Sequence, residues 1–130
     1  MRLSLDDSGQ RFTVRGFTDC SVRINQDELT RSFLLTPEQL IQDVPLHTVA
    51  ALQAGQLNLL YTDAPEVLII GTGLRTLRAQ AAVQAELLGA GIGIEFMDTG
   101  AACRTYTVLA SELRRVSLLI LFPQDNRITN

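Results

Sequence analysis

Three short apolar runs in the second half of the chain, separated by two longer segments with helical spacing, constrain the fold more than any other feature. The runs occupy residues 66–73, 92–97 and 115–123, and each is rich in Val, Ile, Leu or Phe, as strands buried on both faces are. Residues 75–91 and 99–113 between them carry apolar residues at helical intervals. Helical connections of this length favour parallel strands joined by right-handed crossovers, so we expect a βαβαβ unit.

The first third of the chain predicts an antiparallel group of strands. Residues 11–17, 20–25 and 29–35 alternate apolar and polar side chains, which is the two-residue period of a half-buried strand. Gly16 marks a bulge or a tight bend in the first of them. Together with the carboxyl-terminal half, these strands predict the α/β class: a layered domain with a central mixed sheet, helices on one face, and an antiparallel amino-terminal unit.

The middle of the chain predicts short helices. Thr36 stands where an N-cap is expected and Pro37 at the first helical position, which favours a helix over residues 36–41. Residues 47–55 favour another short helix that ends at Gly55. In the longer helical segment that follows the first apolar run, the expected buried face carries Leu77, Ala81, Leu87 and Leu88.

The length and charge of the chain bound its organisation and its partners. Its 130 residues fit one domain, 1–130, with an ordered core over about residues 10–123 and a polar tail at 124–130. The net charge of −3 and the pI of about 5.0 argue against nucleic acid as a partner, because phosphate neutralisation needs clustered Lys and Arg. The adjacent pair Arg114-Arg115 is predicted to be a solvated helix end.

Cysteine usage and hydropathy bound the compartment. Two cysteines, Cys20 and Cys103, are too few for a disulfide framework, and with the single histidine His47 they do not form a metal-cluster pattern. The amino terminus lacks the apolar core of a signal peptide, and no apolar run approaches the ~20 residues that span a bilayer. We therefore expect a cytoplasmic protein with no membrane span and no cofactor.

The tripeptide Asp98-Thr99-Gly100 follows the second apolar run and raises an aspartic-protease alternative, in which two chains each contribute one carboxylate. The surroundings do not fit, because such proteases are nearly all-β, whereas residues 75–91 and 99–113 have a helical pattern. The favoured interpretation is a strand followed directly by a helix, with Thr99 as the N-cap.

Residues 71–76, Gly-Thr-Gly-Leu-Arg-Thr, lie between a strand and a helix, where dinucleotide folds place their phosphate loop. Thr76 replaces the third glycine of that fingerprint, and three strands leave no room for a full dinucleotide domain. Two helix amino termini, near residues 75 and 99, still flank one crevice at the carboxyl ends of neighbouring strands, where N–H groups favour a small anion or polar ligand. The alternative is that the glycines serve only the tight turns.

Cys103 lies near the start of the second helix, where the helix dipole and Arg104 lower the pKa of a thiol. A nucleophile also needs a base, and His47 is the only imidazole, so a small buried apolar thiol is the favoured role and an activated thiol the alternative. Tyr106 and Arg104 are expected either to close the crevice or to form structural hydrogen bonds. The candidate crevice consists of Gly71, Thr72, Gly73, Asp98, Thr99, Cys103, Arg104 and Tyr106.

Four segments carry a family resemblance: Gly71-Thr72-Gly73, Asp98-Thr99, residues 102–106, and Glu112-x-Arg114-Arg115-Val116 at the start of the last strand. In these segments the chain resembles a small prokaryotic domain of unknown function, the MTH-type three-layer domain, whose mitochondrial relatives are assembly factors for respiratory complex I. The resemblance extends over roughly residues 10–123. The chain departs from it at two positions, Thr107, where typical members have Asn, and Leu113, where they often have Gly or Asp.

The resemblance implies a three-layer α/β domain with a central mixed sheet, helices on one face and extra strands on the other. It also implies a protein-binding or assembly module rather than an enzyme, because the family has no established catalytic activity and its mitochondrial members act by binding protein partners. The alternative function is a small-ligand or anion-binding domain, or an enzyme, with its site at the candidate crevice. The identity of the protein partner and the choice between a monomer and a homodimer stay open.

Overall fold

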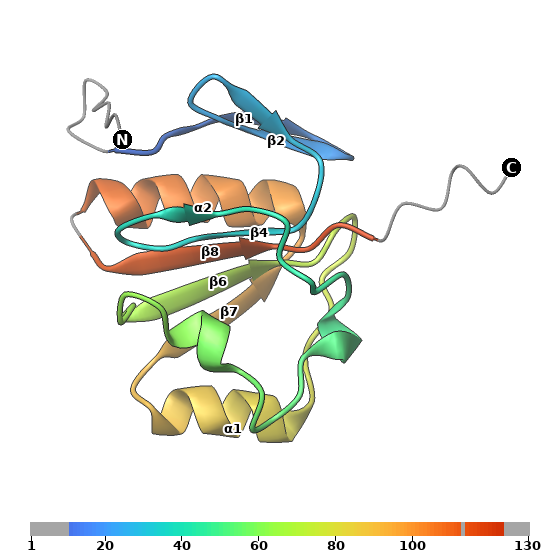
Figure 1. Cartoon of the computed structure of the whole chain (residues 1–130), viewed down its shortest axis with the longest axis vertical. Coiled ribbons are helices and arrows are strands. Elements are labelled where there is room, and N and C mark those ends of the chain that lie inside the picture. Colours follow the sequence, from blue (N-terminus) through green and yellow to red (C-terminus); the bar gives the residue numbers. More distant parts are fainter. Residues whose placement is uncertain (1–10, 113, 124–130) are drawn as a thin grey trace, which may run out of the picture.

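The central element of the fold is a five-stranded mixed sheet (Figure 1). The computed structural model describes residues 11–112 and 114–123, so the predicted tail at 124–130 lies outside the described residues. The strand order is β5-β4-β8-β6-β7; β6 is parallel to β7 and β8, whereas β4 is antiparallel to β8 and β5. The strands are β4 (Phe33–Leu35), β5 (Leu40–Ile41), β6 (Val67–Gly71), β7 (Gly93–Met97) and β8 (Val116–Ile120).

The two helices lie on opposite faces of this sheet. Helix α1 (Ala81–Gly89) connects β6 to β7, and α2 (Thr99–Ser111) connects β7 back across β6 to β8. Two right-handed crossovers that run in opposite directions place their helices on opposite faces. The side chains of β6 agree, since Leu68 and Ile70 share a core cluster with α1, whereas Ile69 shares one with α2. The expectation that both helices cover one face is therefore wrong.

A second, three-stranded antiparallel sheet packs against the outer side of α2 (Figure 1). Gly16 lies at a shift in the pairing register of its first two strands, so the predicted bulge is confirmed. The order from top to bottom of Figure 1 is small sheet, α2, central sheet and α1. The predicted α/β class, with its mixed sheet, βαβαβ half and antiparallel amino-terminal unit, is confirmed. The strands of the small sheet are β1 (Val14–Thr18), β2 (Ser21–Ile24) and β3 (Asp27–Leu29).

The connection between the two sheets departs from the elements that the sequence predicts. Residues 29–35 form two strands instead of one, because β3 ends at Leu29 and β4 begins at Phe33 in the other sheet. The helix predicted over 36–41 is absent from these described residues. The Thr36 N–H donates to the Gln39 carbonyl at 2.8 Å, and this bond closes a turn that leads into β5.

The other helices predicted before the central strands are also shorter than expected. The segment 47–55 contains one 3-10 turn, η1 (Val49–Ala51), and Gly55 follows it in a turn with φ of +83°. A second 3-10 turn, η2 (Asn58–Tyr61), precedes β6. Leu52 directly follows η1, and Leu60 lies within η2. Both are buried in the same core cluster as α1, so this irregular segment completes the core on that face of the sheet.

Helix α1 is shorter than the predicted 75–91 and exposes a different face. The residues before it are held in a turn, because the Thr72 hydroxyl accepts a hydrogen bond from the Leu77 N–H at 3.1 Å. The buried positions Ala79, Val83 and Leu87 recur at intervals of four residues. Of the four residues predicted to face the core, only Leu87 does so; Leu77, Ala81 and Leu88 are exposed.

Candidate functional site

The candidate crevice lies where the carboxyl ends of β6 and β7 meet. The loop after β6 leads to one face of the sheet and the loop after β7 leads to the other, and ligand crevices in α/β sheets form at such divergent strand ends. In Figure 1 both loops and the turn between β1 and β2 lie at the right-hand end of the molecule. The rule that neighbouring strand ends meet therefore places Gly73 and Thr99 together, as the sequence predicted.

Backbone hydrogen bonds join the two loops directly. The Thr72 N–H donates to the Met97 carbonyl at 2.8 Å, and the Thr99 N–H donates to the Gly73 carbonyl at 2.9 Å. The Gly73 N–H in turn donates to the Thr99 hydroxyl oxygen at 3.1 Å. This reciprocal pair of hydrogen bonds fixes one wall of the crevice. The N–H and the hydroxyl oxygen of Thr99 are both engaged in these bonds.

Gly71 and Gly73 are glycines for different structural reasons. A Cβ at Gly71 would lie 2.6 Å from Cδ1 of Ile120 and 3.2 Å from Cβ of Ala102, so this position needs the absence of a side chain. Gly73 has open space around it but adopts φ of +97°, which favours glycine. Gly71 is buried beneath α2, and only Gly73 of the two reaches the crevice.

Asp98, and not the predicted Thr99, is the N-cap of α2. Its carboxylate oxygen accepts a hydrogen bond from the Ala101 N–H at 2.9 Å, while its backbone is extended. The carboxylate thus satisfies one free N–H at the helix start and is favoured there by the helix dipole. An aspartic-protease loop does not fit this arrangement, because the aspartate begins a helix in an α/β fold.

We expect Asp98→Ala to lower the free energy of unfolding by about 1 kcal/mol, because the Ala101 N–H loses its acceptor. Urea unfolding followed by circular dichroism measures the change. Asp98→Asn is the matched control, since asparagine caps helices about as well as aspartate and should stay near the stability of the unaltered chain. Equal destabilisation by both substitutions would show that the charge, and not the cap, stabilises the helix start.

A cavity of about 190 Å³ opens beside this helix start. Arg104 reaches over the ring of Phe17 in β1, with its guanidinium carbon 5.7 Å from the ring centroid, a cation–π distance. The same ring packs against the backbone of Gly100, where a Cβ would lie only 2.8 Å from it. The small sheet therefore forms the second wall of the crevice. The lining residues are Phe17, Thr18, Asp19, Gly73, Leu74, Asp98, Thr99, Gly100 and Arg104.

Cys103 and Tyr106 lie in the core cluster that α2 shares with both sheets, and they do not line the cavity. The side of α2 that carries them is covered, and Cys103 is 1% exposed. Burial raises the pKa of the Cys103 thiol to about 11, against a smaller opposing effect of Arg104, and burial raises the pKa of Tyr106 to about 12. The favoured role of Cys103 as a buried thiol is confirmed, and the alternative of a lowered thiol pKa is wrong because desolvation dominates.

The two thiols are expected to react with iodoacetamide at very different rates at pH 8. Cys20 is exposed in the β1–β2 turn, whereas Cys103 is buried and retains its proton, so Cys20 should be alkylated rapidly and Cys103 only when the chain unfolds. Mass spectrometry of digests taken over time measures both rates. The same reaction in urea is the control, where the rates should converge; comparable rates without urea would contradict the burial of Cys103.

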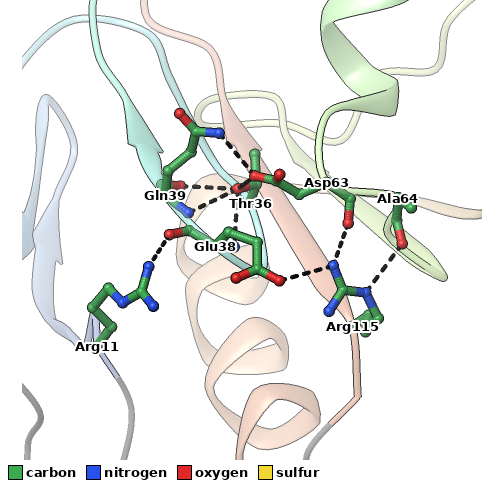
Figure 2. Close-up of polar contacts among 7 residues, drawn as sticks. All are labelled: Arg11, Thr36, Glu38, Gln39, Asp63, Ala64 and Arg115. Carbon is green, nitrogen blue, oxygen red and sulfur yellow. Dashed lines mark hydrogen bonds and ion pairs between the residues drawn. The ribbon is translucent and has the colours of Figure 1, made fainter.

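A polar cluster at the opposite end of the sheet was not found by sequence reasoning (Figure 2). The guanidinium of Arg115 lies 3.2 Å from the Glu38 carboxylate and donates to the backbone carbonyls of Asp63 and Ala64. Asp63 and Ala64 both have positive φ, so Arg115 binds the carbonyls of an unusual turn. Arg114 pairs with Glu66 at 3.5 Å. Both arginines are exposed just after the end of α2, so the predicted solvated pair is confirmed, but its contacts with Glu38, Glu66 and the turn at 63–64 were not foreseen.

The side chain of Asp63 completes this cluster (Figure 2). Its carboxylate accepts hydrogen bonds from the Thr36 hydroxyl at 2.6 Å and the Gln39 amide at 2.9 Å. These bonds, and to a smaller extent the charge of Arg115, hold the pKa of Asp63 below its ordinary value. The cluster joins the β4–β5 hairpin, the turn at 63–64 and the start of β8, and its polar groups bind one another.

The comparison with family models decides the classification. Residues 14–121 match the family described as protein of unknown function (DUF498/DUF598). The chain belongs to this family. In the described parts of the chain, 11–112 and 114–123, no helix has the length and apolar character needed to cross a bilayer, and no group of three or more His, Cys, Asp or Glu side chains is placed to bind a metal.

Two of the curated relatives show what the chain is similar to. The chain is 33% identical over 113 residues to the Danio rerio NADH dehydrogenase (ubiquinone) 1 alpha subcomplex assembly factor 3, a match that covers 86% of the chain and 62% of the relative. It thus spans less than two-thirds of that protein. It is also 27% identical over 99 residues to the 13 kDa major membrane protein of Francisella tularensis, covering 75% of the chain and 80% of the relative.

Two solved structures share the fold. The NMR structure of a Xanthomonas campestris protein is 34% identical with a TM-score of 0.78, and the match covers 93% of this chain and 92% of that one. The solution structure of a Bordetella pertussis protein described as an Mth938-like domain is 29% identical with a TM-score of 0.75, covering 99% and 97%. The resemblance to the MTH-type domain and to the complex I assembly factor is confirmed.

Proposed function

We propose that the chain is a protein-binding module that takes part in assembling respiratory membrane machinery of the complex I type. The observation that carries this proposal is the 33% identity, over 86% of the chain, to a protein named as a complex I assembly factor. The match to the family, over residues 14–121, includes the crevice, both sheets and both helices. A module that acts by binding needs a stable scaffold and an accessible surface rather than a reactive group.

The placement of the reactive side chains is consistent with this role. The thiol of Cys103 is buried and protonated at neutral pH, and the carboxylate of Asp98 caps a helix. The Cys103 thiol packs in the core, and the Asp98 carboxylate stabilises the start of α2, so both groups have a structural role. We propose a cytoplasmic location, where an exposed thiol such as that of Cys20 stays reduced. Cell fractionation tests this location against a membrane association, because the Francisella tularensis relative is named a membrane protein.

Deletion of the gene in the source organism tests the assembly role. We expect less assembled NADH:quinone oxidoreductase on native gels and lower NADH oxidation by isolated membranes, with both restored when the unaltered chain is re-expressed. The abundance of another respiratory complex serves as the control for a general membrane defect. Normal amounts of fully assembled enzyme in the deletion strain would overturn the proposal.

A small anionic or polar ligand at the crevice is the second candidate function. The observation that favours it is the cavity of about 190 Å³, which brings Gly73, Asp98, Thr99 and Arg104 of the predicted site to one place. Thermal unfolding with added phosphate or dicarboxylates tests it, because a ligand that binds only the folded chain raises Tm as its concentration increases. The Arg104→Ala variant should lose this rise in Tm, because Arg104 lines the cavity. A Tm of the unaltered chain that does not change with ligand concentration would exclude this candidate.

A further inference from the structure

Two exposed apolar side chains line the crevice, and a third lies on the loop that presents one of them. Phe17, Leu74 and Leu77 are 41%, 75% and 46% exposed, and the first two line the cavity. Large apolar residues exposed together at a concavity mark binding surfaces more often than scattered ones do. We name this surface the crevice face and define it by Phe17, Leu74, Arg75, Leu77, Arg78 and Arg104.

The crevice face is also cationic, in a chain whose net charge is −3. Arg75 and Arg78 are exposed on the same loop as the two leucines, and neither has an ion-pair partner among the residues that the structure describes. Arg104 interacts with the Phe17 ring and likewise has no ionic partner within the described chain. Some other exposed arginines of the chain are already paired with a carboxylate. These three guanidinium groups are not, so they are available to an acidic partner.

The loop that presents these residues is held by the fold. The Thr72 hydroxyl lies 2.5 Å from the Arg75 carbonyl oxygen and accepts the Leu77 N–H, so the backbone on both sides of Arg75 is fixed. Gly73, at positive φ, bonds reciprocally to Thr99 across the crevice. The side chain of Leu74 is therefore exposed by a fixed backbone, and a preorganised surface loses less conformational entropy when a partner binds.

We propose that the crevice face binds a short acidic segment of a protein partner, with one bulky apolar side chain of that segment in the cavity between Phe17 and Leu74. The carboxylates of the segment then pair with Arg75 and Arg78. This inference rests on the proposed binding function. The concave shape of the cavity, which can take up a single side chain, favours a peptide over the broad surface of an anionic bilayer.

Selection from a phage-displayed library of random peptides against the full chain tests the proposal. We expect enriched peptides with Asp or Glu flanking a Leu, Ile or aromatic residue, and affinities that fall as salt rises. For one synthesised peptide, fluorescence anisotropy should show roughly tenfold weaker binding to Leu74→Ser and to Arg75→Glu. Arg114→Glu is the matched control, because it makes the same charge reversal at the opposite end of α2 and should leave the affinity unchanged.

Three results of the binding experiments would overturn the inference: no such enrichment, equal weakening by the control, or binding of the chain to vesicles of phosphatidylcholine and phosphatidylglycerol that depends on Leu74 and Arg75. Re-expression of the variants in the deletion strain separates the two proposals. If Leu74→Ser and Arg75→Glu fully restore assembly in the deletion strain, the role of the crevice face is refuted and the assembly role stands. A deletion strain without any defect would refute the assembly role and leave the peptide result standing.

Discussion

Ile69→Ala is expected to lower the free energy of unfolding by about 2–5 kcal/mol, the range for removing a large apolar side chain from a close-packed core. Ile69 is fully buried in the middle of β6, with β7 on one side and β8 on the other, and its side chain packs in the cluster of α2 and the small sheet. The alanine leaves a cavity that rigid neighbouring strands cannot close. Urea unfolding, monitored by circular dichroism, measures the loss.

Leu74→Ala is the matched control for this prediction, because it removes similar apolar atoms from a side chain that is 75% exposed. It should change stability by no more than about 0.5 kcal/mol. The same result would establish that changes at Leu74 leave the fold intact when they are used to test the crevice face. If Ile69→Ala lowered the free energy of unfolding no more than the control does, the burial of Ile69 in the core cluster of α2 would be contradicted.

The second half of the fold could be predicted because its signals are local. Each buried strand there is a continuous apolar run, and the segments between the runs are long enough for helices, so the βαβαβ order follows without knowledge of distant contacts. The faces that the helices cover could not be read in this way. They depend on the strand order β8-β6-β7, and the sequence order of strands does not specify their spatial order.

The segment after β4 shows how one local signal fits two structures. The Thr36 hydroxyl accepts hydrogen bonds from the N–H groups of Glu38 and Gln39, which is what an N-cap does at a helix start. The same bonds also stabilise a tight turn. The turn is selected by long-range contacts, the pairing of β5 with β4 and the bond from Thr36 to Asp63. A distant carboxylate leaves no trace in the local pattern.

The candidate crevice was predictable only on the side formed by the central sheet. Gly73 and Thr99 follow adjacent parallel strands, so the rule about strand ends brings them together. Phe17 comes from another sheet, and nothing around it in the sequence indicates that its ring meets Gly100 and Arg104. The prediction for Cys103 considered its distance from the helix start but not its direction, and its side of α2 faces the core.

The buried thiol leads to the second large effect, a loss of stability in alkali. The folded chain keeps the Cys103 proton until about pH 11, whereas the unfolded chain releases it near the ordinary pKa of 9.0. Between these values the folded state binds more protons, so the stability that Cys103 contributes is complete below pH 9 and decreases as the pH rises toward 11. The expected loss is up to about 3 kcal/mol. Urea unfolding at pH 8, 9, 10 and 11 measures it.

Substitutions assign this loss to single groups. Cys103→Ala lowers stability at every pH because it removes buried volume, but its stability should decline less steeply between pH 9 and 11 than that of the unaltered chain. Tyr106→Phe should change the slope mainly above pH 10, since burial raises the pKa of Tyr106 from 10.0 to about 12. Parallel pH profiles for the unaltered chain and Cys103→Ala would mean that the thiol ionises as easily when folded as when unfolded. That result would contradict the burial on which the exclusion of Cys103 from the site depends.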